Sequence, residues 1–147
     1  MKLNIGCGKT NLDGYVNVDI IESADVSCDL NEDWPFYDGS FDELLAMHII
    51  EHLQDGVHFL NECWRVLKPG GTIHLETTDP TGGYHWSDPT HIRGYGPHAF
   101  LDHCQPTKAQ EVADYGMKMW SKVEAKTLMD SNYPVGYALI VAVDMVK

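Results

Sequence analysis

The sequence predicts an α/β fold organised around an open, mostly parallel sheet. The first observation is a short apolar strand at residues 3–5, which runs straight into a glycine turn and is followed by a second strand at residues 15–18. The second observation is that later apolar segments alternate between the period of a strand and the period of a helix. Strands that alternate with helices are typical of sheets whose neighbouring strands run parallel.

The glycine turn at residues 6–8, Gly-Cys-Gly, is the feature on which the functional interpretation depends. Two glycines in three residues indicate a bend that is too crowded for side chains. In open α/β sheets such a turn lets the backbone approach a nucleotide-like ligand, and an acid at the end of the next strand accepts hydrogen bonds from ribose hydroxyls. Asp19 ends the second strand, so the pattern indicates a ligand that contains adenosine.

Two other ligands fit this turn less well. A dinucleotide fingerprint requires a third glycine where this chain has Asn11, and its acid lies about 20 residues on, much further than Asp19. A phosphate loop is suggested by Gly-Lys-Thr at residues 8–10, but its first glycine would fall on Leu3, and residues 12–14 interrupt the helix that should follow. On the glycines alone, a purely structural turn also stays open.

The next segments supply strands and one clear helix. The apolar run at residues 44–47 predicts a strand that is covered on both faces. A helix is expected over residues 56–67 with Asp55 as its N-cap. Its apolar stripe consists of Val57, Leu60, Trp64 and Leu67.

The strand expected at residues 72–78 alternates between apolar and polar side chains. His74 and Glu76 lie on its polar side, which predicts a sheet face that is thinly covered or covered by another subunit.

The second half of the chain is less regular. Residues 79–96 predict a long loop, residues 97–104 and 108–115 predict two short helices, and His98 and His103 are expected on helix surfaces. Two strands are expected at residues 119–128 and 137–145, and their short connection favours an antiparallel pair. We therefore expect a single domain over residues 1–147.

Composition excludes several classes of function. The net charge of −12 opposes binding to phosphate backbones, so no nucleic-acid partner is expected. No apolar run approaches the ~20 residues of a membrane helix, and no signal peptide is visible, so no membrane partner is expected. The four cysteines are scattered without a C-x-x-C pair, which predicts reduced thiols and a cytoplasmic location.

Several segments between Leu3 and Leu75, about half of the chain, together resemble the class I S-adenosylmethionine-dependent methyltransferases, in particular small type-11-like domains. They are LNIGCG, VNVD, Asp29-Leu30, WPFYDGSFDEL at residues 34–44, HIIEHL at residues 48–53 and ECWRVLKPGG at residues 62–71, in the family's order. The resemblance implies a Rossmann-like, mostly parallel sheet of seven strands whose last strand is antiparallel.

The resemblance also implies a cofactor, S-adenosylmethionine, with S-adenosylhomocysteine as its product. By position, the turn residues would line its methionine part, Asp19 would bind the ribose, and the following residue would touch adenine. The residues assigned to the cofactor in this way are Gly6, Cys7, Gly8, Asp19, Ile20, Asp29, Leu30 and His48. The chain departs from the family where it is short, because residues 9–14 and 20–25 leave no room for the usual N-terminal helices.

Candidate catalytic residues lie in the loop after the strand at residues 72–78, namely His85, Asp88, His91 and Arg93. They could line an acceptor site, with Arg93 binding a carboxylate or phosphate, or Asp88 and Arg93 could simply pair to hold the loop. His48, Glu51 and His52 are further candidates. Because HIIEH is not H-E-x-x-H, no metal is expected there, although the four-residue spacing leaves one open; His52 is expected to cap or contact the next loop.

The sequence therefore predicts an enzyme that transfers a methyl group from S-adenosylmethionine to a small molecule or sugar. The alternative is a catalytically inactive cofactor-binding scaffold or regulatory subunit, which the shortened helices favour. A homodimer is left open by the polar sheet face.

Overall fold

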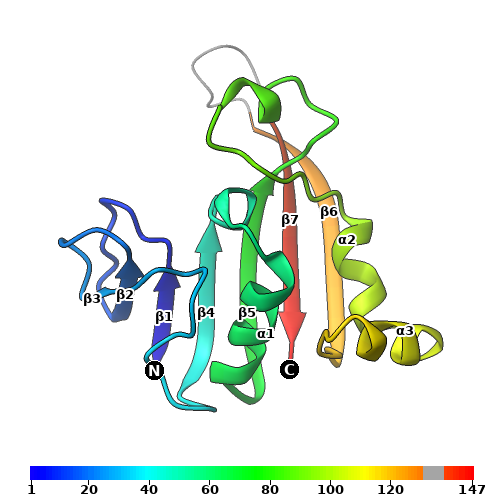
Figure 1. Cartoon of the computed structure of the whole chain (residues 1–147), viewed down its shortest axis with the longest axis horizontal. Coiled ribbons are helices and arrows are strands. Elements are labelled where there is room, and N and C mark those ends of the chain that lie inside the picture. The colour runs from blue at the N-terminus through cyan, green and yellow to red at the C-terminus, as the bar shows by residue number, and fades with distance from the viewer. Residues whose placement is uncertain (131–137) are drawn as a thin grey trace.

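The computed structural model describes residues 1–130 and 138–147. One seven-stranded sheet forms its centre, in the order β3-β2-β1-β4-β5-β7-β6 (Figure 1). The strands are β1 Lys2–Ile5, β2 Tyr15–Asp19, β3 Val26–Ser27, β4 Phe41–Met47, β5 Leu67–Thr78, β6 Lys122–Asp130 and β7 Ala138–Val146. The α-helices are α1 Gly56–Val66, α2 His98–Leu101 and α3 Ala109–Asp114, and the 3-10 turns are η1 Ile50–His52, η2 His85–Ser87, η3 Asp102–Cys104 and η4 Pro106–Lys108.

The sheet has the predicted mixture of directions. β1 is parallel to β2 and to β4, β2 is parallel to β3, and β4 is parallel to β5. β7 is antiparallel to both of its neighbours, β5 and β6. The chain moves outward from β1 to β3 and then returns to the other side of β1, so the strand order reverses between β1 and β4. Ligands of such sheets bind at that reversal, beyond the carboxyl ends of the strands, which form the upper edge in Figure 1.

The hydrophobic core lies on the sheet face that α1 crosses (Figure 1). Register places Leu3 beside Leu44 and Leu44 beside Ile73, so these side chains share one face. The α1 residues that are buried against the sheet and its flanking loop include Phe59, Leu60, Cys63 and Val66. The predicted stripe is therefore wrong in part, since Val57 and Trp64 are only half-buried and Leu67 already belongs to β5.

The opposite face of the sheet carries polar side chains that bond to one another. Lys2 forms an ion pair with Glu43 at 2.9 Å, and the Asn4 amide donates to the Asn17 side chain at 2.9 Å. The expectation that the strand at residues 44–47 is covered on both faces is therefore wrong, because Met47 points to this face and is 36% exposed. Polar groups that bond to each other in this way tolerate contact with water.

The predicted absence of N-terminal helices is confirmed, since residues 6–14 and 20–25 contain only turns and bends. The conformation of the longer loop at residues 31–40 depends on Arg65. Its guanidinium donates to Glu62 at 2.6 and 2.7 Å, to Asp38 at 2.8 Å, and to the carbonyl oxygens of Phe36 and Trp34 at 2.7 and 3.2 Å. Arg65 belongs to the segment ECWRVLKPGG at residues 62–71, so this segment also anchors the loop that leads into β4.

The second half follows the expected order with shifted boundaries. α2 with η3 occupies the predicted helix at residues 97–104, and η4 with α3 occupies the predicted helix at residues 108–115. β6 begins at Lys122 rather than Met119, because the Trp120 amide is bound to the His103 carbonyl at 2.9 Å and its side chain is buried. His103 is only 4% exposed, so its expected place on a helix surface is wrong, whereas His98 is exposed. The connection at residues 131–137 lies outside the described residues.

Two smaller expectations are also answered. The four cysteines are all free thiols, as expected. Among the described residues, the helices are all too short or too polar to cross a membrane.

We expect Arg65→Lys to lower the free energy of unfolding by about 1.5–3 kcal/mol, because an ammonium group cannot reproduce the forked bonds to Glu62 and the loop carbonyls. Urea denaturation followed by circular dichroism measures this. Lys108→Gln, which breaks only the exposed pair with Glu111, is the control and should change stability little. An unchanged midpoint for Arg65→Lys would contradict the anchoring role.

His74 should make stability depend on pH. Burial lowers the pKa of His74, but its bonds to Asp144 and Glu76 outweigh burial and raise the pKa above 6.5. A raised folded pKa stabilises the protein fully below the unfolded pKa, and the contribution is lost as pH rises through the folded value. The stability difference between wild type and His74→Gln should therefore be largest near pH ~5.5 and shrink by pH ~8.5. A difference that grows with pH would refute the assignment.

Candidate active site at the carboxyl edge of the sheet

The glycine turn leaves β1 at the reversal of strand order and takes a conformation that side chains oppose. Gly6 has φ +67° and Gly8 has φ +53°, both in the left-handed region. A Cβ on Gly6 would lie 2.6 Å from Ile49, whereas a Cβ on Gly8 would meet nothing within 4 Å. The Gly6 and Cys7 amides donate to the Val18 carbonyl at 2.9 and 3.2 Å, which holds the turn on β2. Gly6 thus permits close packing, and Gly8 faces open space.

Asp19 closes the turn from the end of β2. One carboxylate oxygen accepts from the Gly8 amide at 2.8 Å, and the other accepts from the Ile21 amide at 3.3 Å. The carboxylate is therefore held beside the glycine turn, and Asp19 itself is half-buried. That position matches the ribose-binding acid expected from the sequence.

A cavity of about 120 Å³ lies next to Asp19. Its lining residues are Asp19, Ile20, Cys28, Asp29, Leu30, Asn31, Ile49 and Leu53. The sequence assigned the residue pairs 19–20 and 29–30 to the cofactor, and the fold brings both pairs to this one cavity. The lining residues Cys28, Asn31, Ile49 and Leu53 were missed, because neighbouring positions in the same short motifs do not show which side chains turn toward the cavity.

Gly6 and Cys7 do not line this cavity. They line a second hollow of about 300 Å³, together with Asn4, Thr10, Leu12, Leu45 and Met47. Burial raises the pKa of the Cys7 thiol, and the nearby Asp19 carboxylate raises it further. Cys7 therefore stays a neutral thiol near pH 7 and is a poor nucleophile.

His48 directly follows β4 and has a strained backbone conformation. Its φ of +53° is the one left-handed value of a non-glycine residue among the described residues. The His48 amide donates to the Glu76 carbonyl at 2.8 Å, and its ring Nδ1 lies 3.4 Å from Glu51 Oε1. The hydrogen bond to Glu51 raises the pKa of His48, although burial lowers it. Burial raises the pKa of Glu51, but hydrogen bonds, including the one to His48, lower that pKa overall. His48 therefore faces Glu51, while its neighbour Ile49 lines the cavity at Asp19.

Three of the four candidate catalytic residues gather above β5. His85 is fully buried, and its Nδ1 lies 2.6 Å from the Thr78 hydroxyl; burial, followed by the His91 charge, lowers its pKa. The rings of His85 and His91 are 4.8 Å apart, and Asp88 Oδ2 lies 3.8 Å from His91 Nε2. His52 contacts this same loop, 38 residues further along the chain at Thr90, and not the loop that directly follows it; its ring lies 4.7 Å from that of His91.

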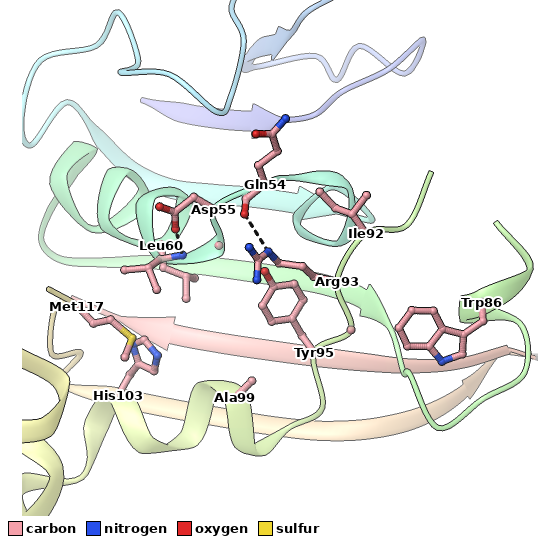
Figure 2. A pocket seen from close by; sticks show the side chains of 13 residues that line it. Gln54, Asp55, Leu60, Trp86, Ile92, Arg93, Tyr95, Ala99, His103 and Met117 are labelled. Atoms are coloured by element: carbon pink, nitrogen blue, oxygen red, sulfur yellow. Dashed lines mark hydrogen bonds between the residues drawn. The ribbon is translucent and has the colours of Figure 1, made fainter. Parts of the chain in front are cut away.

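Arg93 faces a different hollow. Its Nε donates to the Gln54 carbonyl at 2.8 Å, while Asp88 accepts from Thr90. Asp88 and Arg93 thus have separate partners, and the interpretation that they pair to hold the loop is not supported. Figure 2 shows Arg93 and Tyr95 at a hollow of about 570 Å³ between the start of α1 and α2, with His103 and Met117 on its far wall. This hollow was missed, because its lining comes from separate segments spread over residues 54–117.

Gly6→Ala and Gly8→Ala form a matched pair. Both place an alanine in the left-handed region, which costs about 1–2 kcal/mol, but only Gly6→Ala adds a clash with Ile49, for a total of about 2–5 kcal/mol. Thermal unfolding should show the larger loss for Gly6→Ala. Equal losses in the two variants would show that contact with Ile49 does not fix the turn.

Comparison with known proteins places these features in one family. A family model described as a methyltransferase domain matches residues 3–75, about half of the chain. Ajmaline N-methyltransferase of Rauvolfia serpentina is 48% identical over 50 residues, which are 33% of this chain and 17% of that protein. The mitochondrial 2-methoxy-6-polyprenyl-1,4-benzoquinol methylase of Leishmania donovani is 33% identical over 75 residues, 51% of this chain and 24% of that protein. The chain thus spans a quarter or less of these curated relatives.

Solved structures share the fold over a longer stretch. A SAM-dependent methyltransferase from Archaeoglobus fulgidus is 19% identical with a TM-score of 0.67, covering 99% of this chain and 85% of that one. The 1,6-didemethyltoxoflavin-N1-methyltransferase of Burkholderia thailandensis, solved with 1,6-didemethyltoxoflavin and S-adenosylhomocysteine, is 14% identical with a TM-score of 0.61, covering 99% and 70%. With its reversed last strand and its glycine turn facing an acid, the chain belongs to the class I S-adenosylmethionine-dependent methyltransferases.

Proposed function

We propose that this protein binds S-adenosylmethionine and transfers its methyl group to a small molecule. The observation that carries the proposal is the Asp19 carboxylate, held by the Gly8 amide at the mouth of a cavity where the β1 turn meets the end of β2. A backbone turn without side chains and a fixed carboxylate suit the hydroxyls and polar edges of an adenosine.

The cofactor assignment follows the shape of this site. We assign the ribose to Asp19, and the adenine to the cavity that continues past Ile20 to Leu30. Asp29 holds Asn31 through one carboxylate oxygen, at 2.9 and 3.0 Å, and we assign its other oxygen to the adenine amino group. The methionine part is assigned to the turn at residues 6–8 and to the end of β4 at His48.

The acceptor side is assigned to the loop that follows β5. The hollow of about 570 Å³ has the size of a small-molecule site, and Arg93 could bind an acidic group in it. His85, Asp88 and His91 supply the polar wall between this loop and β5. Methyl transfer is an in-line displacement in which a lone pair of the acceptor forms the new bond to carbon while the carbon–sulfur bond breaks. The protein's contribution is to position the acceptor and exclude water.

The relatives support a small acceptor. The names of two of them specify ajmaline and a 2-methoxy-6-polyprenyl-1,4-benzoquinol, and a third is solved with bound 1,6-didemethyltoxoflavin. The net charge of −12 supports the absence of a nucleic-acid substrate. A single domain, a cytoplasmic location and a homodimer remain predictions.

A scaffold that binds the cofactor without turnover is the second candidate. The observation that favours it is the cavity of about 120 Å³ at Asp19, which is small compared with ligand pockets of about 300–1,000 Å³. Transfer of a labelled methyl group to phenol, quinol or amine acceptors supports the enzyme. Binding of the cofactor with no transfer across cell metabolite extracts supports the scaffold.

Asp19→Ala should abolish binding of S-adenosylhomocysteine, measured by calorimetry, because the ribose hydroxyls lose their acceptor. Asp25→Ala is the control. Asp25 also braces β2, through the Asn17 amide at 2.8 Å and the Asn17 side chain at 2.7 Å, but it does not line the cavity. If both variants bind like the wild type, the site assignment is wrong; if both lose binding, the loss reports damage to β2 instead.

A further inference from the structure

One side-chain cluster at the carboxyl edge of the sheet does not line the cavity at Asp19. Glu51 and His52 lie in η1, directly after β4, and His91 lies in the loop after β5. Each offers one metal-ligating atom, and these atoms lie within 4.8 Å of one another. Among the described residues, this is the one group of three such side chains that could surround an ion.

The hydrogen bonds of the two histidines leave both Nε2 atoms available. His91 Nδ1 lies 2.7 Å from the His85 carbonyl oxygen, and His52 Nδ1 lies 3.3 Å from the Thr90 carbonyl oxygen and 3.0 Å from the Thr90 hydroxyl. A carbonyl oxygen only accepts, so each Nδ1 carries a hydrogen, and the neutral form of each ring has its lone pair on Nε2. Metal-binding histidines show this arrangement, in which a carbonyl fixes the tautomer.

Glu51 supplies a second, independent observation. Its side chain is fully buried, and Oε1 faces His48 and the Thr78 amide, the latter at 3.3 Å. Oε2 is also buried and has no partner with hydrogen-bond geometry, although the Thr77 hydroxyl is near enough to help lower the pKa of this carboxyl. A buried carboxylate oxygen without a partner costs free energy, so this atom points to a bound water or ion.

We propose that Glu51, His52 and His91 bind a divalent transition metal of the zinc class. Two imidazoles and one carboxylate form a set that zinc uses at sites with an open position, and imidazole disfavours magnesium and calcium. Asp88 Oδ2, 3.8 Å from His91 Nε2, is placed to accept a hydrogen bond from a water on the metal. The amides of Ile92 and Arg93 donate to the Glu51 carbonyl at 2.9 and 3.3 Å, which docks the loop of His91 on η1.

Binding requires the three side chains to move closer together. Zinc ligands lie about 2.0–2.2 Å from the ion, so ligand atoms now within 4.8 Å of one another must approach by about 1 Å. The rival interpretation is a cluster of histidines that contact each other and the loop without any ion, since the His52 and His91 rings are already 4.7 Å apart. A direct titration with metal separates the two.

The experiment uses the whole chain, stripped with a chelator and dialysed. Calorimetric titration with Zn²⁺ should show one equivalent, and Co²⁺ should give visible absorption bands of a site with nitrogen and oxygen ligands. His91→Ala and Glu51→Gln should each weaken Zn²⁺ binding by more than about 100-fold, and Asp88→Asn by about tenfold. His98→Ala, an exposed histidine outside the cluster, should leave the affinity unchanged.

Circular dichroism and cooperative thermal unfolding test whether each variant is folded. The metal proposal is overturned if the folded wild type binds no stoichiometric Zn²⁺, or if His91→Ala and Glu51→Gln bind it as the wild type does. Because the titration contains no methyl donor, its outcome is separate from that of the proposed function. Zn²⁺ binding without cofactor binding would defeat the methyltransferase proposal alone, and the reverse would defeat the metal site alone.

Discussion

The bond from the Gly8 amide to the Asp19 carboxylate is the interaction on which the rest of the site depends. It joins the turn after β1 to the end of β2, two segments that the parallel pairing of these strands already brings to one edge. Gly6 adds a third segment, because the absence of a Cβ lets Ile49, two residues after β4, come into contact with the turn. Three strand ends are thereby tied together, and the cavity at Asp19 lies among the segments that follow them.

The shortened N-terminal half explains the unusual character of the sheet. Segments too short for helices cannot cover a sheet face, so that face must bear contact with water. The ion pair of Lys2 with Glu43 and the bond between Asn4 and Asn17 meet this requirement with polar groups that satisfy each other. Arg65 performs a related task on the other face, where it holds a loop in place through its bonds to carbonyl oxygens.

The histidines show which positions the sequence predicts and which contacts only the tertiary structure creates. His48 to His52 form a short segment whose place after β4 follows from the order of elements. The partner of this segment, His91, lies 39 residues beyond His52, and the loop between β5 and α2 carries no periodic signal that would place it. The side chains meet because the loop after β5 docks on η1 through the Glu51 carbonyl.

By itself the sequence determined the order of strands and helices, the glycine turn with its acid, the N-cap at Asp55 and the loss of the first helices, because glycine, proline and apolar periodicity act locally. Tertiary structure decided which face of α1 is buried, that His103 is interior, that Arg93 lines a different hollow from Asp88, and that Oε2 of Glu51 has no partner. These features depend on contacts between segments far apart in the chain, and no local preference of a residue specifies its distant neighbours.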